Sequence, residues 1–198
     1  MTDAFVREFI KLFSDALNNL YDKESAIIAS EVNERCMAAH LFAFMKYKWR
    51  RCPALASYHI DYEYNREGLD GASKKIYCKY CDEKEEKWHW IIPDLIIHTR
   101  GDVSGTRNLV VIEFKKWEIP PGHDIEKLSE MTKQDSDGSY KYKFGFHVIL
   151  GQVIDQTKIE LFINGEEEGS WMFSELSDMT ESLIQKLGEE GLLLDKLR

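Results

Sequence analysis

Hydrophobic side chains recur at helical spacing through the first quarter of the chain. Residues 4–20 carry an apolar residue at every third or fourth position, which predicts an amphipathic helix. The same spacing continues over residues 22–46 and predicts a second, longer helix. This second stripe includes two acidic residues, Glu31 and Glu34, on an otherwise apolar edge. Either that edge of the helix is solvated, or an acid is placed there for function.

Alternating residues and apolar runs predict strands in the middle of the chain. Residues 58–65 alternate strictly between aromatic or aliphatic side chains and polar ones, as a half-buried strand does. Residues 89–98 and 108–115 contain near-continuous apolar runs, which are typical of central strands covered on both faces. The polar stretch at about 66–88 is predicted to be a long insertion between strands, with a short strand near residues 75–80.

The second half of the chain predicts one helix, two strands and a further helix. Residues 124–133 have the apolar spacing of a short amphipathic helix. Residues 140–152 and 157–164 resemble strands, and residues 171–187 predict a C-terminal helix. This order of elements predicts a single α/β domain over residues 1–198, with a mixed sheet flanked by helices.

Composition narrows the class of protein. With 43% hydrophobic residues in 198, the chain can bury a sizeable core, which argues against intrinsic disorder. The formal net charge of −9 argues against a protein that coats nucleic acid through clustered Lys and Arg side chains. A nuclease stays compatible with this charge, because acidic metal ligands and solvent-facing acids can lie apart from a local basic groove.

Targeting signals are absent from the sequence pattern. The N-terminal residues lack a basic region followed by an apolar segment, so no signal peptide is expected. No apolar run approaches the ~18 residues that a membrane span needs, so no membrane partner is expected. Four cysteines without a secretory signal favour reduced thiols and a cytoplasmic location.

A candidate metal site lies where two predicted neighbouring strands meet. Asp94 follows Pro93 within the first strand, and Glu113-Phe114-Lys115 ends the second. Because strand residues alternate faces, Glu113 and Lys115 are expected on one side of the sheet. Two carboxylates can hold Mg²⁺, which prefers oxygen ligands and keeps several waters. The alternative is an ordinary cross-strand ion pair of Lys115 with Asp94 or Glu113, worth about 0–1 kcal/mol where exposed.

A set of motif residues in a fixed order carries a resemblance to a known superfamily. The set comprises a helix acid, a Pro-Asp pair in one strand and Glu-x-Lys at the end of the next: Glu34, Pro93-Asp94 and Glu113-Phe114-Lys115. It resembles the PD-(D/E)XK nuclease-like, or restriction-endonuclease-like, superfamily. Segments around these motifs also look like a group of small uncharacterised members, and the resemblance covers about residues 30–150.

The resemblance implies a particular core. Its order is helix, three strands, helix, strand (αβββαβ), which would occupy about residues 24–155 of this chain. The insertion at about 66–88 would decorate this core. The helix at the N-terminus and a C-terminal extension at 156–198 would be additions to it.

The resemblance also implies a role for each motif residue. Asp94 and Glu113 would ligate a catalytic Mg²⁺ or Mn²⁺ ion, and the Phe114 carbonyl could complete the protein ligands. Glu34 matches the helix acid that supports the metal, directly or through water. Lys115 would orient the attacking water first and help to deprotonate it second, because lysine beside carboxylates tends to stay protonated. The implied activity is that of a metal-dependent phosphodiesterase, a nuclease that hydrolyses DNA.

Partners follow from that activity. The helix around Lys127 and Glu130 lacks the Gln-x-x-x-Tyr signature of exonuclease-like relatives, which disfavours a processive exonuclease. DNA is the expected partner, and cutting both strands of a duplex would favour a homodimer. A rival interpretation is a catalytically silent nuclease-like module that binds a partner or assembles a complex, which the acidic charge motivates.

Zinc is a second rival. Cys78 and Cys81 have the Cys-x-x-Cys spacing of zinc ligands, but a tetrahedral site needs two more. Only Cys52, His59 and His89 are available as further ligands, and no second Cys-x-x-Cys pair exists. The pair is therefore either part of a zinc-stabilised regulatory protein or two thiols in a hairpin.

Overall fold

The protein combines five α-helices with one large sheet and two small ones among the residues that the structure describes. The computed structural model describes residues 1–30, 33–67, 72–77, 88–101, 107–117, 119–120, 123–134 and 140–193. The helices are α1 (Asp3–Lys23), α2 (Ser25–Ala29), α3 (Glu34–Trp49), α4 (Asp124–Thr132) and α5 (Leu176–Glu189). The strands are β1 (His59–Tyr62), β2 (Arg66–Glu67), β3 (Ala72–Ser73), β4 (Lys75–Tyr77), β5 (Trp88–Trp90), β6 (Leu95–His98), β7 (Asn108–Lys116), β8 (Phe144–Leu150), β9 (Lys158–Ile163) and β10 (Glu166–Met172).

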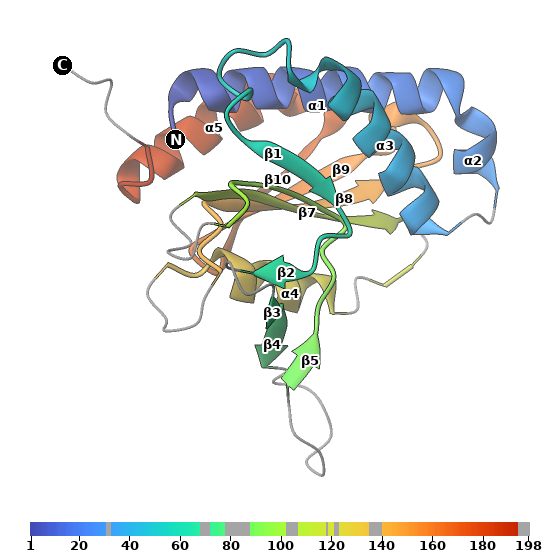
Figure 1. Cartoon of the computed structure of the whole chain (residues 1–198). Coiled ribbons are helices and arrows are strands. Elements are labelled where there is room, and N and C mark those ends of the chain that lie inside the picture. Colours follow the sequence, from blue (N-terminus) through green and yellow to red (C-terminus); the bar gives the residue numbers. More distant parts are fainter. Residues whose placement is uncertain are drawn as a thin grey trace.

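The main sheet is mixed, as predicted. Its strand order is β1-β6-β7-β8-β9-β10, with β7 and β8 parallel and every other neighbouring pair antiparallel. Helices α1, α3 and α5 lie on one face of this sheet, and α4 lies on the other (Figure 1). The predicted α/β class with a mixed sheet flanked by helices is therefore confirmed. Strands β2 to β4 come from the predicted insertion; β2 pairs with β3, and β4 pairs with β5, which follows the insertion.

Strand β7 sends alternate side chains to the two layers. Ile112 and Phe114 belong to the large apolar cluster under α1, α3 and α5. Val111 packs with α4 on the opposite face. Because side chains alternate along a strand, Glu113 and Lys115 share the α4 face with Val111. The sequence pattern predicted this alternation for Glu113 and Lys115.

The N-terminal helix is part of the main core. Phe9 lies with its ring centroid 5.8 Å from that of Phe144 and 5.9 Å from that of Phe146, both on β8. Phe13 lies 6.0 Å from Phe9 and 5.9 Å from Phe146. All four rings are fully buried. Burying each such side chain contributes about 1.5–3 kcal/mol, so the packing of α1 on β8 stabilises the fold.

The prediction of one continuous second helix over residues 22–46 is wrong, because three helices share this range. Helix α1 runs to Lys23, α2 is short, and α3 begins only at Glu34. Asn33 caps α3, because its side-chain oxygen accepts a hydrogen bond of 2.9 Å from the Arg35 backbone N–H. Helical periodicity continued across the break and hid it from the sequence pattern. Glu34 therefore lies in the first turn of a helix, where its negative charge is favourable.

Two other boundaries also differ from the prediction. The predicted strand over residues 89–98 is divided into β5 and β6, with Pro93 in the gap, where a residue without an N–H cannot donate to a ladder. Residues from Trp171 were predicted to be helical, but Trp171 lies in β10 and α5 begins at Leu176. The turn at Asn164, whose φ is 52°, returns the chain so that β10 pairs with β9.

Candidate metal centre

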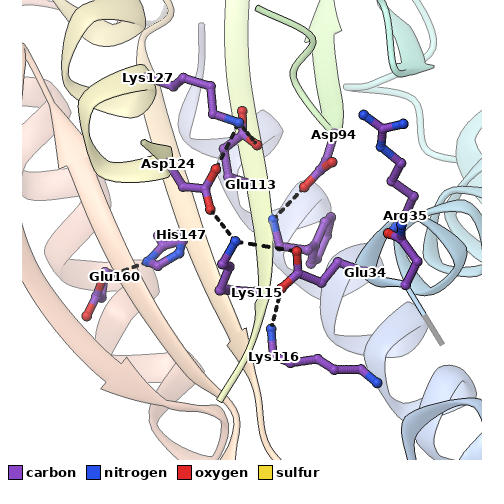
Figure 2. A network of polar contacts seen from close by, with 12 residues as sticks. Glu34, Arg35, Asp94, Glu113, Lys115, Lys116, Asp124, Lys127, His147 and Glu160 are labelled. Carbon is purple, nitrogen blue, oxygen red and sulfur yellow. Dashed lines mark hydrogen bonds and ion pairs between the residues drawn. The ribbon is translucent and has the colours of Figure 1, made fainter. Parts of the chain in front are cut away.

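Asp94 and Glu113 lie at the same end of the β6–β7 ladder. Leu95 of β6 pairs with Ile112 of β7, so the next residue on each antiparallel strand, Asp94 and Glu113, are neighbours. Their carboxyl groups flank β7 in Figure 2. The juxtaposition that the sequence predicted for these two carboxylates is therefore present.

The end of β7 extends beyond β6, and side chains take the place of the missing strand. The Phe114 N–H donates a hydrogen bond of 2.8 Å to Asp94 Oδ2. The Lys116 N–H donates one of 3.2 Å to Glu34 Oε1. Backbone N–H groups in such positions need acceptors, so these bonds fix the carboxylates of Asp94 and Glu34 against β7. In a strand the N–H and C=O of one residue point the same way, so the Phe114 carbonyl opens toward the Asp94 side.

Two lysines bridge the acids. The Lys115 ammonium lies 3.2 Å from Asp124 Oδ2 and 3.5 Å from Glu34 Oε2. The Lys127 ammonium lies 2.7 Å from Glu113 Oε2 and 2.9 Å from Asp124 Oδ1. The simple ion pair of Lys115 with Asp94 or Glu113 is therefore replaced by a wider network (Figure 2). We call this network the carboxylate–lysine cluster; it comprises Glu34, Asp94, Glu113, Asp124, Lys115 and Lys127.

The cluster has an excess of negative charge. Four carboxylates face two ammonium groups, which leaves two formal negative charges when all six groups are ionised. The ammonium group of Lys116 is directed elsewhere and donates to the Ser30 carbonyl. An excess of two negative charges is the complement of one divalent cation.

Burial shifts the protonation of the two strand acids. Glu113 is 1% exposed, and its Oε1 has no hydrogen-bond partner among the described residues. Burial raises the pKa of Glu113 well above its ordinary value, although the Lys127 ammonium opposes that shift. Burial also raises the pKa of Asp94, against the hydrogen bond from Phe114. Both acids therefore lie where a cation or a proton is needed to offset the cost of a buried charge.

Lys115 stays protonated despite its partial burial. Burial alone would lower the pKa of Lys115, but the attraction of Asp124 and Glu34 outweighs it and raises the pKa. The pKa of Lys127 is raised in the same way by Glu113 and Asp124, again against the effect of burial. Both side chains are therefore stable cations beside the carboxylates.

Sequence reasoning missed the contribution of α4. Helix α4 begins at Asp124, directly after its N-cap residue His123. The side chains of Asp124 and Lys127, one turn apart on α4, both bond to the cluster. The signal available in the sequence was this acid–base pair at i and i+3 in the helix that follows the Glu-x-Lys strand. Such a pair shows that both side chains lie on one face of the helix, but it does not show which residues they contact.

A buried polar pair continues the row of polar residues across the sheet. Glu113 is in register with His147 of β8, which is in register with Glu160 of β9. His147 Nδ1 lies 2.9 Å from Glu160 Oε2, and His147 is 1% exposed with Nε2 unpartnered among the described residues. Burial would raise the pKa of Glu160, but Lys158 and His147 lower it. Sequence reasoning did not identify this pair, because the crossover that aligns β8 with β7 is not encoded locally.

A second cluster on the outer strands is structural. Asp61 of β1 accepts hydrogen bonds from His98 Nε2 at 2.9 Å and from Arg100 Nε at 2.8 Å. A carboxylate only accepts, so Nε2 of His98 must carry the proton. Burial would raise the pKa of Asp61, but His98 and Arg100 outweigh it and lower the pKa. Burial lowers the pKa of His98, so this ring is neutral at pH 7.

The donor set suits a hard cation held by few protein ligands. Within the described residues, no three His, Cys, Asp or Glu side chains gather into a preformed metal cage. Mg²⁺ is commonly held by one or two carboxylates with water and substrate oxygens, and Asp94, Glu113 and the Phe114 carbonyl are the groups that could hold it here. The unpartnered Oε1 of Glu113 and the excess negative charge fit such an ion. The predicted zinc ligands Cys78 and Cys81 lie outside the described residues.

Comparisons with known proteins found no relative of this chain. None of the family models, curated proteins or solved structures compared with the chain matches it. No helix in the described part of the chain has the length and apolar character needed to cross a membrane.

Proposed function

We propose that the protein is a metal-dependent phosphodiesterase that hydrolyses DNA on a restriction-endonuclease-like core. The observation that carries this proposal is the convergence of Asp94, Glu113 and Lys115 at one end of two adjacent strands. The order α3-β1-β6-β7-α4-β8 supports it, because it matches the αβββαβ order of that core. An ion pair alone would not explain why two carboxylates are buried beside an excess of negative charge.

Asp94, Glu113 and the Phe114 carbonyl would hold a Mg²⁺ or Mn²⁺ ion, with Glu34 supporting it directly or through water. A bound divalent cation lowers the pKa of a water molecule and offsets charge on phosphoryl oxygens. The neighbouring residues keep these ligands in place. The Phe114 N–H orients Asp94, and Lys127 holds one oxygen of Glu113 while the other stays unpartnered.

Lys115 would act on the substrate side of the site. Its ammonium group stays protonated and is positioned by Asp124 and Glu34, so it can orient a water and offset negative charge that develops on a phosphate. The acids on either side of Lys115 limit its rotamers, which keeps the ammonium group preorganised. In this scheme Glu34 has two tasks, because it also caps the Lys116 N–H of the strand end.

Metal binding is the first test. Saturating Mg²⁺ or Mn²⁺ should raise the melting temperature, because an ion at 100 times its Kd stabilises the folded state by about 2.7 kcal/mol. Asp94→Asn and Glu113→Gln should each abolish this shift. Glu181→Gln is the matched control, because Glu181 is an exposed acid paired with Arg7 away from the site, and its shift should equal that of the wild type.

Hydrolysis is the second readout. Wild-type protein should cleave a DNA substrate only with Mg²⁺ or Mn²⁺, and Lys115→Ala should lower the rate about 100-fold or more. Cleavage that persists in Glu113→Gln would refute the site. A wild type that shows neither a melting shift nor cleavage would refute the function.

A silent binding module is the second candidate. The observation that favours it is the ion pairing of Glu113 with Lys127, which lets the acid stay buried with no metal. This candidate predicts a folded protein whose melting temperature is unchanged by Mg²⁺ and Mn²⁺. The same titration therefore separates the two.

A further inference from the structure

Two grooves adjoin the carboxylate–lysine cluster on different sides. The first has a volume of about 870 Å³ and shares Glu34 with the cluster; Lys116 and Trp117 also line it. The second has a volume of about 340 Å³ and shares Lys127 with the cluster; Trp90 also lines it. A chain-like ligand that crosses the cluster would therefore pass from one groove into the other.

Each groove carries a tryptophan that is open to solvent. Trp90 is 64% exposed and Trp117 is 53% exposed. By contrast, Trp49 is 3% exposed and its indole N–H donates to the Tyr58 carbonyl. A large aromatic ring left outside the core can offer a ligand the face that no neighbour covers, which for Trp90 is the face opposite the Lys75 ammonium. Two such rings beside one site point to a binding surface.

Local positive charge accompanies these rings. The Lys75 ammonium lies 4.0 Å from the centroid of the Trp90 ring. Arg35 lines the same groove and pairs with Glu63 at 3.1 Å, and the acid Glu126 lines it as well. Lys116 lies beside Trp117 in the other groove. These cations contrast with the net charge of −9 of the whole chain.

We propose that a single-stranded nucleic acid binds across the cluster, with unpaired bases stacked on Trp90 and Trp117. This inference rests on the proposed phosphodiesterase function and names its substrate class. Stacking on aromatic side chains is tolerant of sequence and needs bases that are not already stacked in a duplex. The cluster, which shares one residue with each groove, would then face the phosphodiester backbone of the strand.

Fluorescence anisotropy tests this inference without any catalysis. Full-length Glu113→Gln protein in EDTA is titrated against a fluorescein-labelled 12-nucleotide DNA, an RNA of the same sequence and the DNA duplex. The single strands should bind at least tenfold more tightly than the duplex. Tighter binding of the DNA strand or of the RNA strand identifies which nucleic acid the protein prefers. Equal binding shows that it accepts both.

Variants in the same background locate the contact. Trp90→Ala and Trp117→Ala should each weaken single-strand binding about 5- to 150-fold. Trp90→Phe should restore part of the affinity, because it keeps a ring. Tyr47→Ala is the matched control: Tyr47 is 73% exposed but lies about 20 Å along α3 from Glu34, and its loss should change the Kd less than twofold.

Three results would overturn the inference: no single-strand binding, duplex binding as tight as single-strand binding, or Trp90→Ala and Trp117→Ala within twofold of the parent. Melting curves of each variant in EDTA check that the fold is kept, and Trp90→Phe covers a variant that unfolds. A Mn²⁺-dependent melting shift of the wild type without strand binding would overturn this inference alone. Tight strand binding without metal binding or cleavage would instead overturn the phosphodiesterase.

Discussion

Glu113 is a buried acid whose environment is costly for a charged carboxylate and useful for a metal ligand. Only Lys127 contacts it directly among the described hydrogen-bonding groups, and its second oxygen has no partner. Leaving a polar atom unpaired in the interior costs about 1–3 kcal/mol. A residue kept in such a position without a structural benefit is typical of a functional site, where a ligand supplies the missing partner.

Asp61 shows the opposite case, in which the buried carboxylate has hydrogen-bond donors. Its carboxylate accepts from His98 and Arg100, and its folded-state pKa is lowered. An acid with a lowered folded-state pKa stabilises the protein above its unfolded pKa, and this contribution is lost as the pH falls through the folded pKa. Because the lowering starts from an ordinary value of 3.8, the loss begins below about pH 4.

Asp61→Asn should therefore lower the free energy of unfolding by about 1.5–3 kcal/mol at pH 7, the value of hydrogen bonds to a charged group. The difference from the wild type should shrink as the pH falls below about 4. Urea unfolding at several pH values measures it. Asp155→Asn, at an exposed acid, is the control and should stay within about 0.5 kcal/mol. An Asp61 effect that is the same at pH 7 and pH 3.5 would contradict the charge-based explanation.

At the level of elements, the position of α4 determines whether the cluster forms. Asp124 and Lys127 reach Lys115 and Glu113 only because α4 packs closely on the sheet. Gly145 of β8 permits that approach, since a Cβ built there would lie 2.9 Å from a Leu128 methyl group and 3.2 Å from that of Thr132. A strand glycine in this position provides space for a helix.

Gly145→Ala should therefore displace α4 and lower the free energy of unfolding by about 1–3 kcal/mol, the cost of overpacking a core. It should also weaken the Mn²⁺-dependent melting shift, because Lys127 and Asp124 move with α4. Gly188→Ala in α5 is the control: its added Cβ meets only Leu193, at 3.9 Å, so it should stabilise the protein by up to about 1 kcal/mol. Equal effects of the two substitutions in melting experiments would refute the packing argument.

At the level of the whole molecule, residues 156–193 belong to the same folding unit as the site. They include β9, β10 and α5. Ile159, Leu161 and Leu183 are fully buried in the main apolar cluster, together with α1. The main apolar cluster therefore includes side chains from the predicted core and from the predicted C-terminal extension.

A chain truncated after Asp155 should lose cooperative thermal unfolding, because β8 loses its β9 neighbour and the core loses these apolar side chains. Circular dichroism melting and binding of a hydrophobic dye measure this loss. A chain that ends at Leu193 keeps all of the described elements and should melt like the full chain. A sharp melting transition in the shorter chain would show that the core folds without its last two strands.

The sequence by itself determined the pairing of the two acid-bearing strands. Alternation along β7 placed Glu113 and Lys115 on one face, and the apolar runs joined by a polar hairpin brought Asp94 beside Glu113. These are local properties, because they depend on side-chain direction and on a connection between neighbouring strands. The mixed α/β class followed in the same way from the order of the elements.

Only the tertiary structure decided the rest of the cluster. The contacts of Lys127 and Asp124 depend on how α4 docks over Gly145, and the row from Glu113 to His147 depends on a parallel crossover. The contacts of α4 with β7, and of β7 with β8, join residues of different elements, so the geometry of a single helix or strand does not fix them. The position of Glu34 in the first turn of α3 was also not evident from the sequence pattern, because the apolar periodicity continued across the break between α2 and α3.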